Sequence, residues 1–449
     1  MNAFPFTANA TPEYLGYVPE AADVVVIGGG IAGISAAWEL AGKGLQVVLC
    51  EKGRVGAEQS GRNWGWIRVQ GRDPAEIPLM LEARQLWERW SERLGRDLGF
   101  KRSGVTYLAD TDKDLEDFEA WMAHAREYEL DTRMVSAAET GKLIKGAAAD
   151  RWKGALHTAS DARAEPWVAV PMITRALAQA GVTICEHCAV RGLDIQGGRL
   201  VGVSTEIGPI RADAVVLAGG AWSSLFLRAH GLTLPQLSIL SSVCATDPLD
   251  TAFDSAAADG RIGFRRRADG GVTLAASSAH TMFIGPDAFR HLRPFWHQAR
   301  ENYRSTTFKP WSPRNWPDSW RTPRSWSPEE ATPFEAMRVL NPTPDAAALN
   351  KALDDFAQVF PKIGKPGVRA RWGGMIDSLP DVVPVIDRIA ALPGLVVGTG
   401  LSGHGFGIGP AVGRVLADLV TGEDPRHDLK RFRFSRFSDG STLKPGPAL

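Results

Sequence analysis

The residues of this chain whose spacing most clearly indicates a binding function are three glycines. Gly28, Gly30 and Gly33 form the pattern G-x-G-x-x-G. They follow an apolar run, residues 24–27, that predicts a strand, and they precede a pattern of small and apolar residues, 34–40, that predicts a helix. In such a turn the first glycine permits the tight bend, the second lets the backbone approach a pyrophosphate, and the third lets helix and strand pack closely. The pattern therefore predicts a phosphate-binding turn.

An acidic residue extends this unit. A second apolar run ends on Glu51, 18 residues beyond Gly33, where a carboxylate binds the hydroxyls of an adenosine ribose. The amides at the helix start, including those of Ile31 and Ala32, carry a partial positive charge that suits phosphate. We expect a strand, helix and strand that together bind a dinucleotide, with Lys52 also at the nucleotide.

The composition favours an enzyme that acts on a small molecule. The chain of 449 residues has 51 Lys and Arg against 51 Asp and Glu, which gives no reason to expect nucleic acid or an anionic membrane as a partner. No apolar stretch reaches the roughly 18 residues that span a bilayer. Residues 1–20 lack a basic start followed by an apolar core, so we expect a cytoplasmic protein without a transmembrane segment.

The cysteines point to a reducing compartment rather than to a metal or redox centre. There are four, at 50, 185, 188 and 244, too few and too scattered for a disulfide framework. Cys185 and Cys188 form a single C-x-x-C inside residues 182–190, which we expect to be a strand. No second pair completes a zinc site, so we interpret these two cysteines as structural.

Segments rich in glycine and aliphatic residues are spread along the chain, which indicates a nucleotide domain assembled from separate pieces. We expect helices at 73–94, 114–128, 167–180 and 408–420, and strands at 182–190, 200–205 and 214–218. The expected nucleotide domain comprises 22–78, 150–232 and 369–430, a second domain that caps it comprises 79–149 and 233–368, and terminal extensions cover 1–21 and 431–449.

Tryptophan and proline alternate in one stretch of the expected second domain. So much proline rules out a continuous helix or a central strand there. We expect an irregular covering segment whose tryptophans pack inward, with a substrate lid or a subunit contact as the alternative. The tryptophans are Trp296, Trp311, Trp316, Trp320 and Trp326.

Two further motifs accompany the first glycine turn. One runs Ser60-Gly-Arg-Asn-Trp-Gly-Trp66, and the other runs Gly400-Leu-Ser-Gly-His-Gly-Phe406. In this order and spacing the three motifs resemble the flavin-dependent D-amino acid oxidase superfamily, which includes glycine oxidase, sarcosine oxidase and D-amino acid dehydrogenases. Segments 213–223 and 372–381 are similar to further segments of that family. The resemblance extends over residues 22–425 and thins over 233–368.

The resemblance implies an α/β protein with a Rossmann-like FAD-binding domain of the glutathione-reductase type, assembled from discontinuous segments, and a mixed-sheet substrate or cap domain. It implies one FAD, with its adenosine at the first glycine turn and its isoalloxazine at the domain boundary. The amides at 402–405 suit the negative charge that a reduced flavin carries. The expected cofactor contacts are Gly28, Gly30, Ile31, Ala32, Gly33, Glu51, Lys52, Ser60, Arg62, Asn63, Trp64, Gly65, Val190, Gly219, Gly220, Trp222, Gly374, Gly400, Ser402, Gly403, His404 and Gly405.

Two departures from the family concern the flavin and the substrate. Gly374 stands where sarcosine oxidases carry the cysteine that tethers their flavin, so we expect noncovalent FAD. Gly407 stands where monomeric sarcosine oxidases carry a lysine that holds the substrate carboxylate. A buried carboxylate needs a cation, so another residue must supply it if the substrate is an amino acid.

Arginines are the candidates for that anchor, because bidentate pairing suits a carboxylate. Arg68 is the first candidate and Arg371 the second, and both are predicted to be catalytic-site residues together with His404, whose alternative is a packing role. Residues 265–267 are three arginines before a hairpin signal, and we expect them to point to solvent.

The resemblance implies an FAD-dependent enzyme that oxidises the carbon-nitrogen bond of an amino acid or N-substituted glycine. The substrate is D-amino acid-like, sarcosine-like or iminodiacetate-like, hydride passes to flavin N5, and the imine is hydrolysed to an oxo acid and an amine or ammonia. Dioxygen or an electron carrier then reoxidises the flavin. The alternatives are an FAD-dependent amine oxidase without carboxylate recognition, an NAD-dependent dehydrogenase, and a catalytically silent flavoprotein that binds or senses a ligand.

Overall fold

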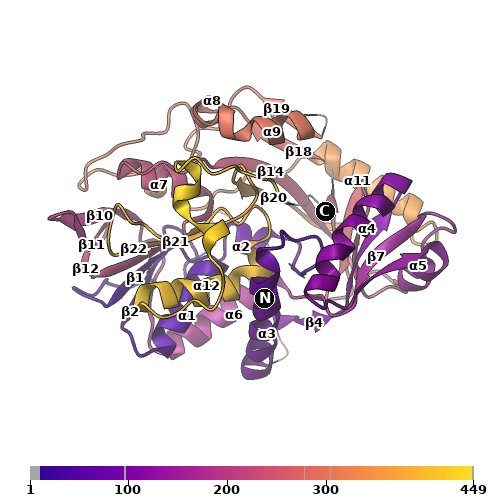
Figure 1. The fold of residues 1–449 in the computed structure, drawn as a ribbon, viewed down its shortest axis with the longest axis horizontal. Helices are drawn as coiled ribbons and strands as arrows, with labels where there is room; N and C mark the ends of the chain where they lie inside the picture. The colour runs from indigo at the N-terminus through magenta and orange to yellow at the C-terminus, as the bar shows by residue number, and fades with distance from the viewer. Residues whose placement is uncertain (1–10, 96–97, 278, 304, 447–449) are drawn as a thin grey trace.

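Two sheets organise the chain, and the computed structural model describes residues 11–95, 98–277, 279–303 and 305–446 of it (Figure 1). The first ten residues of the expected N-terminal extension and the last three of the C-terminal extension lie outside the described residues. Among the described residues, none of the helices is both long and apolar enough to cross a membrane.

The first sheet carries the nucleotide unit and has the order β21-β22-β13-β1-β2-β9. Its strands are parallel except β21, which pairs antiparallel with β22 at the edge. The middle strand β1 is short and almost wholly aliphatic, as is typical of a strand that is covered on both faces. The strands are β1 (Val24–Ile27), β2 (Val47–Cys50), β9 (Thr183–Cys185), β13 (Ala214–Leu217), β21 (Val385–Arg388) and β22 (Leu395–Thr399).

Helices cover one face of this sheet and a small antiparallel sheet covers the other. Val24 and Val26 pack with the helices α1 (Ile31–Gly42), α6 (Pro166–Gln179) and α12 (Gly405–Thr421). Side chains of the opposite face pack with β10 (Val190–Gln196), β11 (Arg199–Thr205) and β12 (Gly208–Arg211). The helices α1 and α12 lie very close, because a Cβ placed on Gly413 would be 2.3 Å from the Cβ of Ser35.

The second sheet is mixed and contains ten strands in the order β19-β18-β14-β17-β16-β15-β5-β7-β6, with β20 also paired to β14. α11 (Ala346–Val359) packs on one face of β14, β16 and β17, and α4 (Asp112–Glu127) and α5 (Ala137–Leu143) pack near β6 and β7. The strands are β5 (Val105–Ala109), β6 (Thr132–Ser136), β7 (Gly154–Thr158), β14 (Leu237–Thr246), β15 (Ala256–Ala258), β16 (Ile262–Arg266), β17 (Val272–Ala276), β18 (His280–Phe283), β19 (Thr306–Lys309) and β20 (Val368–Ser378).

Short elements connect the two sheets. A three-stranded sheet has the order β3-β8-β4, and its strands are β3 (Trp66–Ile67), β4 (Lys101–Arg102) and β8 (Ala162–Arg163). The remaining helices are α2 (Gln59–Arg62), α3 (Glu76–Leu94), α7 (Ser223–Ala229), α8 (Pro286–Arg290), α9 (Leu292–Asn302) and α10 (Pro333–Ala336), with 3-10 turns at Gly220–Trp222, Lys430–Phe432 and Phe434–Phe437.

The helix α3 runs through the boundary that we place after residue 78, and it packs against α12 of the nucleotide domain. The indole nitrogen of Trp87 donates to the carbonyl of Gly407 at 3.0 Å, and the rings of Trp87 and Phe406 are 4.9 Å apart. This helix therefore braces the start of α12, where the third glycine motif lies.

The single strand expected at 182–190 is wrong, because the chain bends within it. β9 ends at Cys185, His187 has a φ of 50°, and β10 begins at Val190. The bend is held by the buried carboxylate of Glu186, which accepts from the amides of Tyr14 and Val55. All four cysteines are buried and free.

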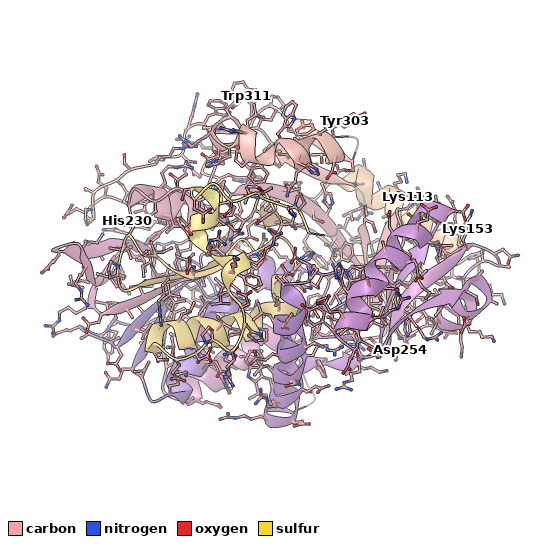
Figure 2. All side chains as sticks on the ribbon, viewed as in Figure 1. Lys113, Lys153, His230, Asp254, Tyr303 and Trp311 are labelled. Carbon is pink, nitrogen blue, oxygen red and sulfur yellow. The ribbon has the colours of Figure 1, made fainter. Side chains whose placement is uncertain are left out.

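The tryptophan and proline segment differs from the expectation in where its side chains lie. Trp316 is buried and Trp326 donates to the carbonyl of Arg191 at 2.7 Å, as an inward-packed segment requires. Trp296, Trp311 and Trp320 are 62%, 70% and 46% exposed, so the inward packing expected for them is wrong. Figure 2 shows Trp311 at the outer rim of the molecule, above α8 and α9.

The arginines at 265–267 also differ from the expectation. Arg265, on β16, and Arg267, just after this strand, are both buried. Arg265 pairs with both carboxylate oxygens of Glu165, at 2.8 and 2.9 Å, and Arg267 binds Asp269 and the carbonyl of Thr246. The prediction of solvent exposure is wrong for these two, because Glu165, distant in sequence, neutralises Arg265 and the nearby Asp269 neutralises Arg267.

Candidate active site

A cavity of about 750 Å³ runs between the two sheets. One end is lined by the first glycine turn and Glu51, the middle by residues 59–64 and 217–222, and the other end by residues of β5, α4, β14 and β18. The start of α12 also lines it, at residues 401–406. All three motifs thus meet in one elongated space.

The glycine turn has the tight packing that its pattern predicts. Gly28 has a φ of 109°, and a Cβ there would lie 2.4 Å from the carbonyl oxygen of Ala218. A Cβ on Gly33 would lie 2.0 Å from the carbonyl oxygen of Gly28, so this glycine serves the packing of helix on strand and does not line the cavity. Gly30 faces the hydroxyl of Ser60, which accepts from the amide of Ile31 at 2.8 Å.

Glu51 is held in place at the same end. Its two carboxylate oxygens accept from the amides of Gly29 and Gly53, each at 2.8 Å. Burial raises the pKa of this carboxyl. Lys52 lines the cavity beside it, with its ammonium 2.7 Å from Glu58 and 4.4 Å from the ring centre of Trp222.

The middle of the cavity wall is formed by Gln59, Ser60, Arg62, Asn63 and Trp64. Arg62 is buried, and its guanidinium donates to the carbonyls of Ala57 and Gly373, at 2.7 and 3.0 Å. Burial lowers the pKa of Arg62 to about 10. Asn63 shapes the turn by accepting from the amide of Gly65 at 2.7 Å.

The third motif is a strained turn before α12. Ser402 has a φ of 49° and its amide donates to the carbonyl of Asp377 at 3.0 Å, while the Asp377 carboxylate accepts from the amide of Gly400 at 3.0 Å. Burial raises the pKa of Asp377 to about 6. The carboxyl group of Asp377 therefore supports the turn that presents residues 402–405 to the cavity.

Most of the predicted contacts line this cavity, and four do not. Gly33, Gly65 and Gly400 lie behind the wall, where a Cβ would be 2.0, 2.4 and 2.2 Å from neighbouring atoms, so they provide close packing rather than contact. The predicted residues that line it are Gly28, Gly30, Ile31, Ala32, Glu51, Lys52, Ser60, Arg62, Asn63, Trp64, Arg68, Val190, Gly219, Gly220, Trp222, Gly374, Ser402, Gly403, His404 and Gly405.

Arg371 is the fourth residue outside, and the structure does not bring it to the other candidates. Its side chain is exposed on β20, and its guanidinium donates to Asn350 at 2.9 Å. Its neighbour Trp372 faces inward and donates to the carbonyl of Arg62 at 2.8 Å. Alternation along the strand therefore turns Arg371 away from the cavity.

Arg68 and His404 meet at the far end of the cavity. A guanidinium nitrogen of Arg68 lies 3.4 Å from Nε2 of His404, and another donates to the carbonyl of Gln70. Arg68 is 8% exposed and makes no ion pair with any described residue. Burial, with Arg72 and Arg68 nearby, holds the pKa of His404 well below its usual value, so its imidazole is neutral and can accept from Arg68.

A second arginine braces this arrangement, and sequence reasoning missed it. Arg72 is fully buried, donates to the carbonyls of Arg68 and His404 at 3.2 and 3.1 Å, and pairs with Glu76 at 3.0 Å. A Cβ on Gly407 would lie 3.1 Å from the carbonyl oxygen of Trp66 and 3.2 Å from the Cα of Ile67. The glycine at this position thus lets the backbone of β3 pack closely against the first turn of α12.

Three aromatic residues of the far end were also missed as site residues. Trp66, Tyr107 and Phe118 all line the cavity, although they come from β3, β5 and α4. His280, on β18, lines it as well, and its ring has no hydrogen-bond partner among the described residues. A helical pattern marked Phe118 as apolar, but no local signal places these side chains in one cavity.

Comparison with known proteins identifies the family. The model of the DAO family, described as FAD dependent oxidoreductase, matches residues 23–419. The chain belongs to this family. Among curated proteins, this family member is 27% identical over 414 residues to a glycine oxidase of Pseudomonas putida, a match that covers 90% of this chain and 95% of the relative.

Solved structures agree with this assignment. An L-amino acid deaminase from Proteus myxofaciens superposes with a TM-score of 0.90 at 32% identity, over 95% of this chain and 96% of that one. The L-amino acid deaminase from Proteus vulgaris gives a TM-score of 0.88 at 29% identity, over 94% and 98%. The predicted α/β fold, the oxidoreductase class and the FAD cofactor are confirmed, and the alternative of an NAD-dependent dehydrogenase is wrong.

The residues present fit FAD. The glycine cradle at Gly28 has no room for a side chain, and the cavity continues from it past Trp64 to the amides that follow Ser402, as an extended dinucleotide requires. Gly374 lines the cavity without a thiol, in agreement with the expected noncovalent attachment, which stays a prediction. When bound, FAD supplies the acceptor of two electrons.

Proposed function

We propose that this FAD-dependent enzyme oxidises the carbon-nitrogen bond of an amino acid or N-substituted glycine whose carboxylate binds Arg68. The product is an imine, which water then hydrolyses to an oxo acid and an amine or ammonia. The proposal agrees with the glycine oxidase and L-amino acid deaminase activities named for the relatives.

The proposal rests on one observation: Arg68 is buried at the cavity and makes no ion pair with a described residue. A buried guanidinium without a counter-ion is costly, and here it borders a cavity rather than packed protein. A carboxylate is the anion that an amino acid offers, and its two oxygens match the two donors of the guanidinium edge. Substrate binding therefore supplies the charge that Arg68 lacks.

His404 has a supporting part. As a neutral imidazole it accepts from Arg68 and adds no second positive charge beside the substrate. A neutral neighbour also leaves the substrate amine free of repulsion from an imidazolium. We propose that His404 fixes the orientation of the Arg68 guanidinium and lines the substrate space.

Anaerobic bleaching of the flavin tests the proposal. The purified yellow protein is mixed without dioxygen with D- and L-amino acids, N-alkyl glycines and the decarboxylated amine of each. We expect an amino acid to bleach the flavin at a concentration at which its amine does not. Equal bleaching by the amine favours the amine oxidase without carboxylate recognition, an alternative with which the absence of a lysine at Gly407 agrees. If no compound bleaches the flavin, the result favours a catalytically silent flavoprotein. Hydrogen peroxide production on admitting air then distinguishes dioxygen from an electron carrier.

A further inference from the structure

We infer that the preferred substrate is an amino acid with a single carboxylate and a large apolar or aromatic side chain, which lies along a wall formed by Trp66, Tyr107 and Phe118. This inference rests on the proposed function, because it takes Arg68 as the point where the carboxylate binds. It names the substrate class that the far end of the cavity accepts.

The aromatic wall is centred on Tyr107, and Arg68 lies against this middle ring. The guanidinium carbon of Arg68 lies 5.3 Å from the ring centre of Tyr107. The Tyr107 ring is 6.4 Å from that of Trp66 and 6.3 Å from that of Phe118. All three rings border the cavity, and burial raises the pKa of the Tyr107 hydroxyl, so the wall is uncharged. The carboxylate anchor therefore lies within reach of the middle of this wall.

A wall of this kind selects for apolar surface. All three residues line the cavity, and apolar substrate atoms that cover them are removed from water, which favours binding. Aromatic rings add a preference for edge or offset contacts with one another. Glycine and sarcosine carry no side chain to cover the wall, so the wall contributes little to their binding.

The charged residues at the Arg68 end of the cavity can neutralise one substrate carboxylate. Arg68 has no ion pair with a described residue, whereas Glu76 neutralises Arg72 and His404 is uncharged. One net positive charge is therefore available beside the aromatic wall.

Beyond the wall lie two acidic side chains. Asp114 and Asp117 line the cavity on the same helix as Phe118; Asp117 pairs with the exposed Lys113, and Asp114 accepts from the amides of Asp110 and Thr111. A second carboxylate, as in iminodiacetate or aspartate, meets these carboxylates and no free cation among the described residues here. Acidic substrates are therefore disfavoured by the same end of the cavity that favours aromatic ones.

The first test compares substrates on the wild-type holoenzyme. We expect kcat/KM for phenylalanine or leucine, in the enantiomer that reacts, to exceed that for glycine, sarcosine, aspartate and iminodiacetate by about tenfold or more. A preference for glycine, sarcosine or a diacid overturns the inference and leaves the proposed function standing. Failure of every amino acid to bleach the flavin overturns both.

Two variants test the wall and its charges separately. Phe118→Ala should lower kcat/KM for phenylalanine about tenfold and leave that for alanine within about twofold, whereas Phe289→Ala, which removes an exposed ring outside the cavity, should change neither. Asp117→Arg, at a half-exposed position, should raise kcat/KM for aspartate relative to phenylalanine. An unchanged ratio in both variants contradicts the inference.

A binding measurement separates recognition from turnover. Carboxylic acids without an amine cannot be oxidised at a carbon-nitrogen bond, so their dissociation constants follow from changes in the flavin spectrum. We expect phenylacetate to bind about tenfold or more tightly than acetate, and Phe118→Ala to reduce this difference. Equal binding of both acids by the wild-type protein refutes the role of the wall.

Discussion

Replacement of Arg68 by alanine gives the most direct view of the site. The substitution removes a guanidinium that is 8% exposed and that has no ion pair among the described residues, so the substrate carboxylate would enter the cavity without a cation. Loss of a charged partner from a buried pair costs about 2 to 4 kcal/mol. Since about 1.4 kcal/mol corresponds to a factor of ten, the half-saturating concentration of a carboxylated substrate should rise roughly 30-fold to 1000-fold.

The assay is the anaerobic rate of flavin bleaching against substrate concentration, for an amino acid and for its decarboxylated amine. Arg371→Ala is the matched control, because it removes the same side chain from an exposed position outside the cavity. The amine should be oxidised equally by the Arg68→Ala variant and the wild-type protein, and Arg371→Ala should behave as wild type with both compounds. An unchanged half-saturating concentration for the amino acid in Arg68→Ala, with full flavin content, would remove Arg68 from the role.

Four further outcomes are expected. Gly30→Val should purify without FAD, seen as loss of flavin absorbance, since the added side chain occupies the pyrophosphate approach; full absorbance contradicts the turn assignment. Glu76→Gln leaves Arg72 buried without a counter-ion, so urea unfolding should show a loss of about 3 to 5 kcal/mol, and a loss below about 1 kcal/mol would show that the pair is not important. Acid precipitation should release all flavin into the supernatant, because Gly374 offers no thiol; flavin in the pellet contradicts noncovalent binding. Asp161 has its pKa raised by burial to about 6, so the folded state binds a proton more tightly than the unfolded state; between pH 4 and pH 6 its contribution to stability should fall as pH rises, and Asp161→Asn should lose this part of the pH dependence of the free energy of unfolding.

Local signals predicted the fold well where the chemistry of neighbouring residues decides the structure. The turn at Gly28 needs a positive φ and no side chain, and both requirements are visible in the glycine pattern itself. The expected helices at 73–94 and 114–128 correspond to α3 and α4 because their apolar residues repeat with the helical period. The strands β1, β2 and β13 were predictable because each of them is short and mostly aliphatic.

The parts that could not be predicted depend on contacts between distant segments. Arg265 is buried only because Glu165, one hundred residues earlier, pairs with it, and nothing near Arg265 indicates this partner. Arg72 acts through the carbonyl of His404, a backbone atom whose position no side-chain pattern reveals. Arg371 was placed at the cavity by its nearness to Trp372, but two successive residues of a strand face opposite sides.

The bend at Cys185 escaped prediction for a different reason. Residues 182–190 have the apolar composition of a continuous strand. His187 nevertheless adopts a positive φ, which cannot be predicted from the residue type. The carboxylate of Glu186 accepts hydrogen bonds from the amides of Tyr14 and Val55, so segments far away in the chain stabilise the bend.

The distribution of the cavity wall over the whole chain affects how the protein acquires its cofactor. Gly28 leaves the ribosome nearly four hundred residues before Ser402 and His404, although all three residues line the same cavity. The cavity wall cannot form completely before this late segment is synthesised, so we expect FAD to be bound only after residues 402–405 have emerged. Once captured, FAD joins early and late segments and raises the stability of the folded form by mass action, which makes flavin supply a determinant of how much of this protein survives in a cell.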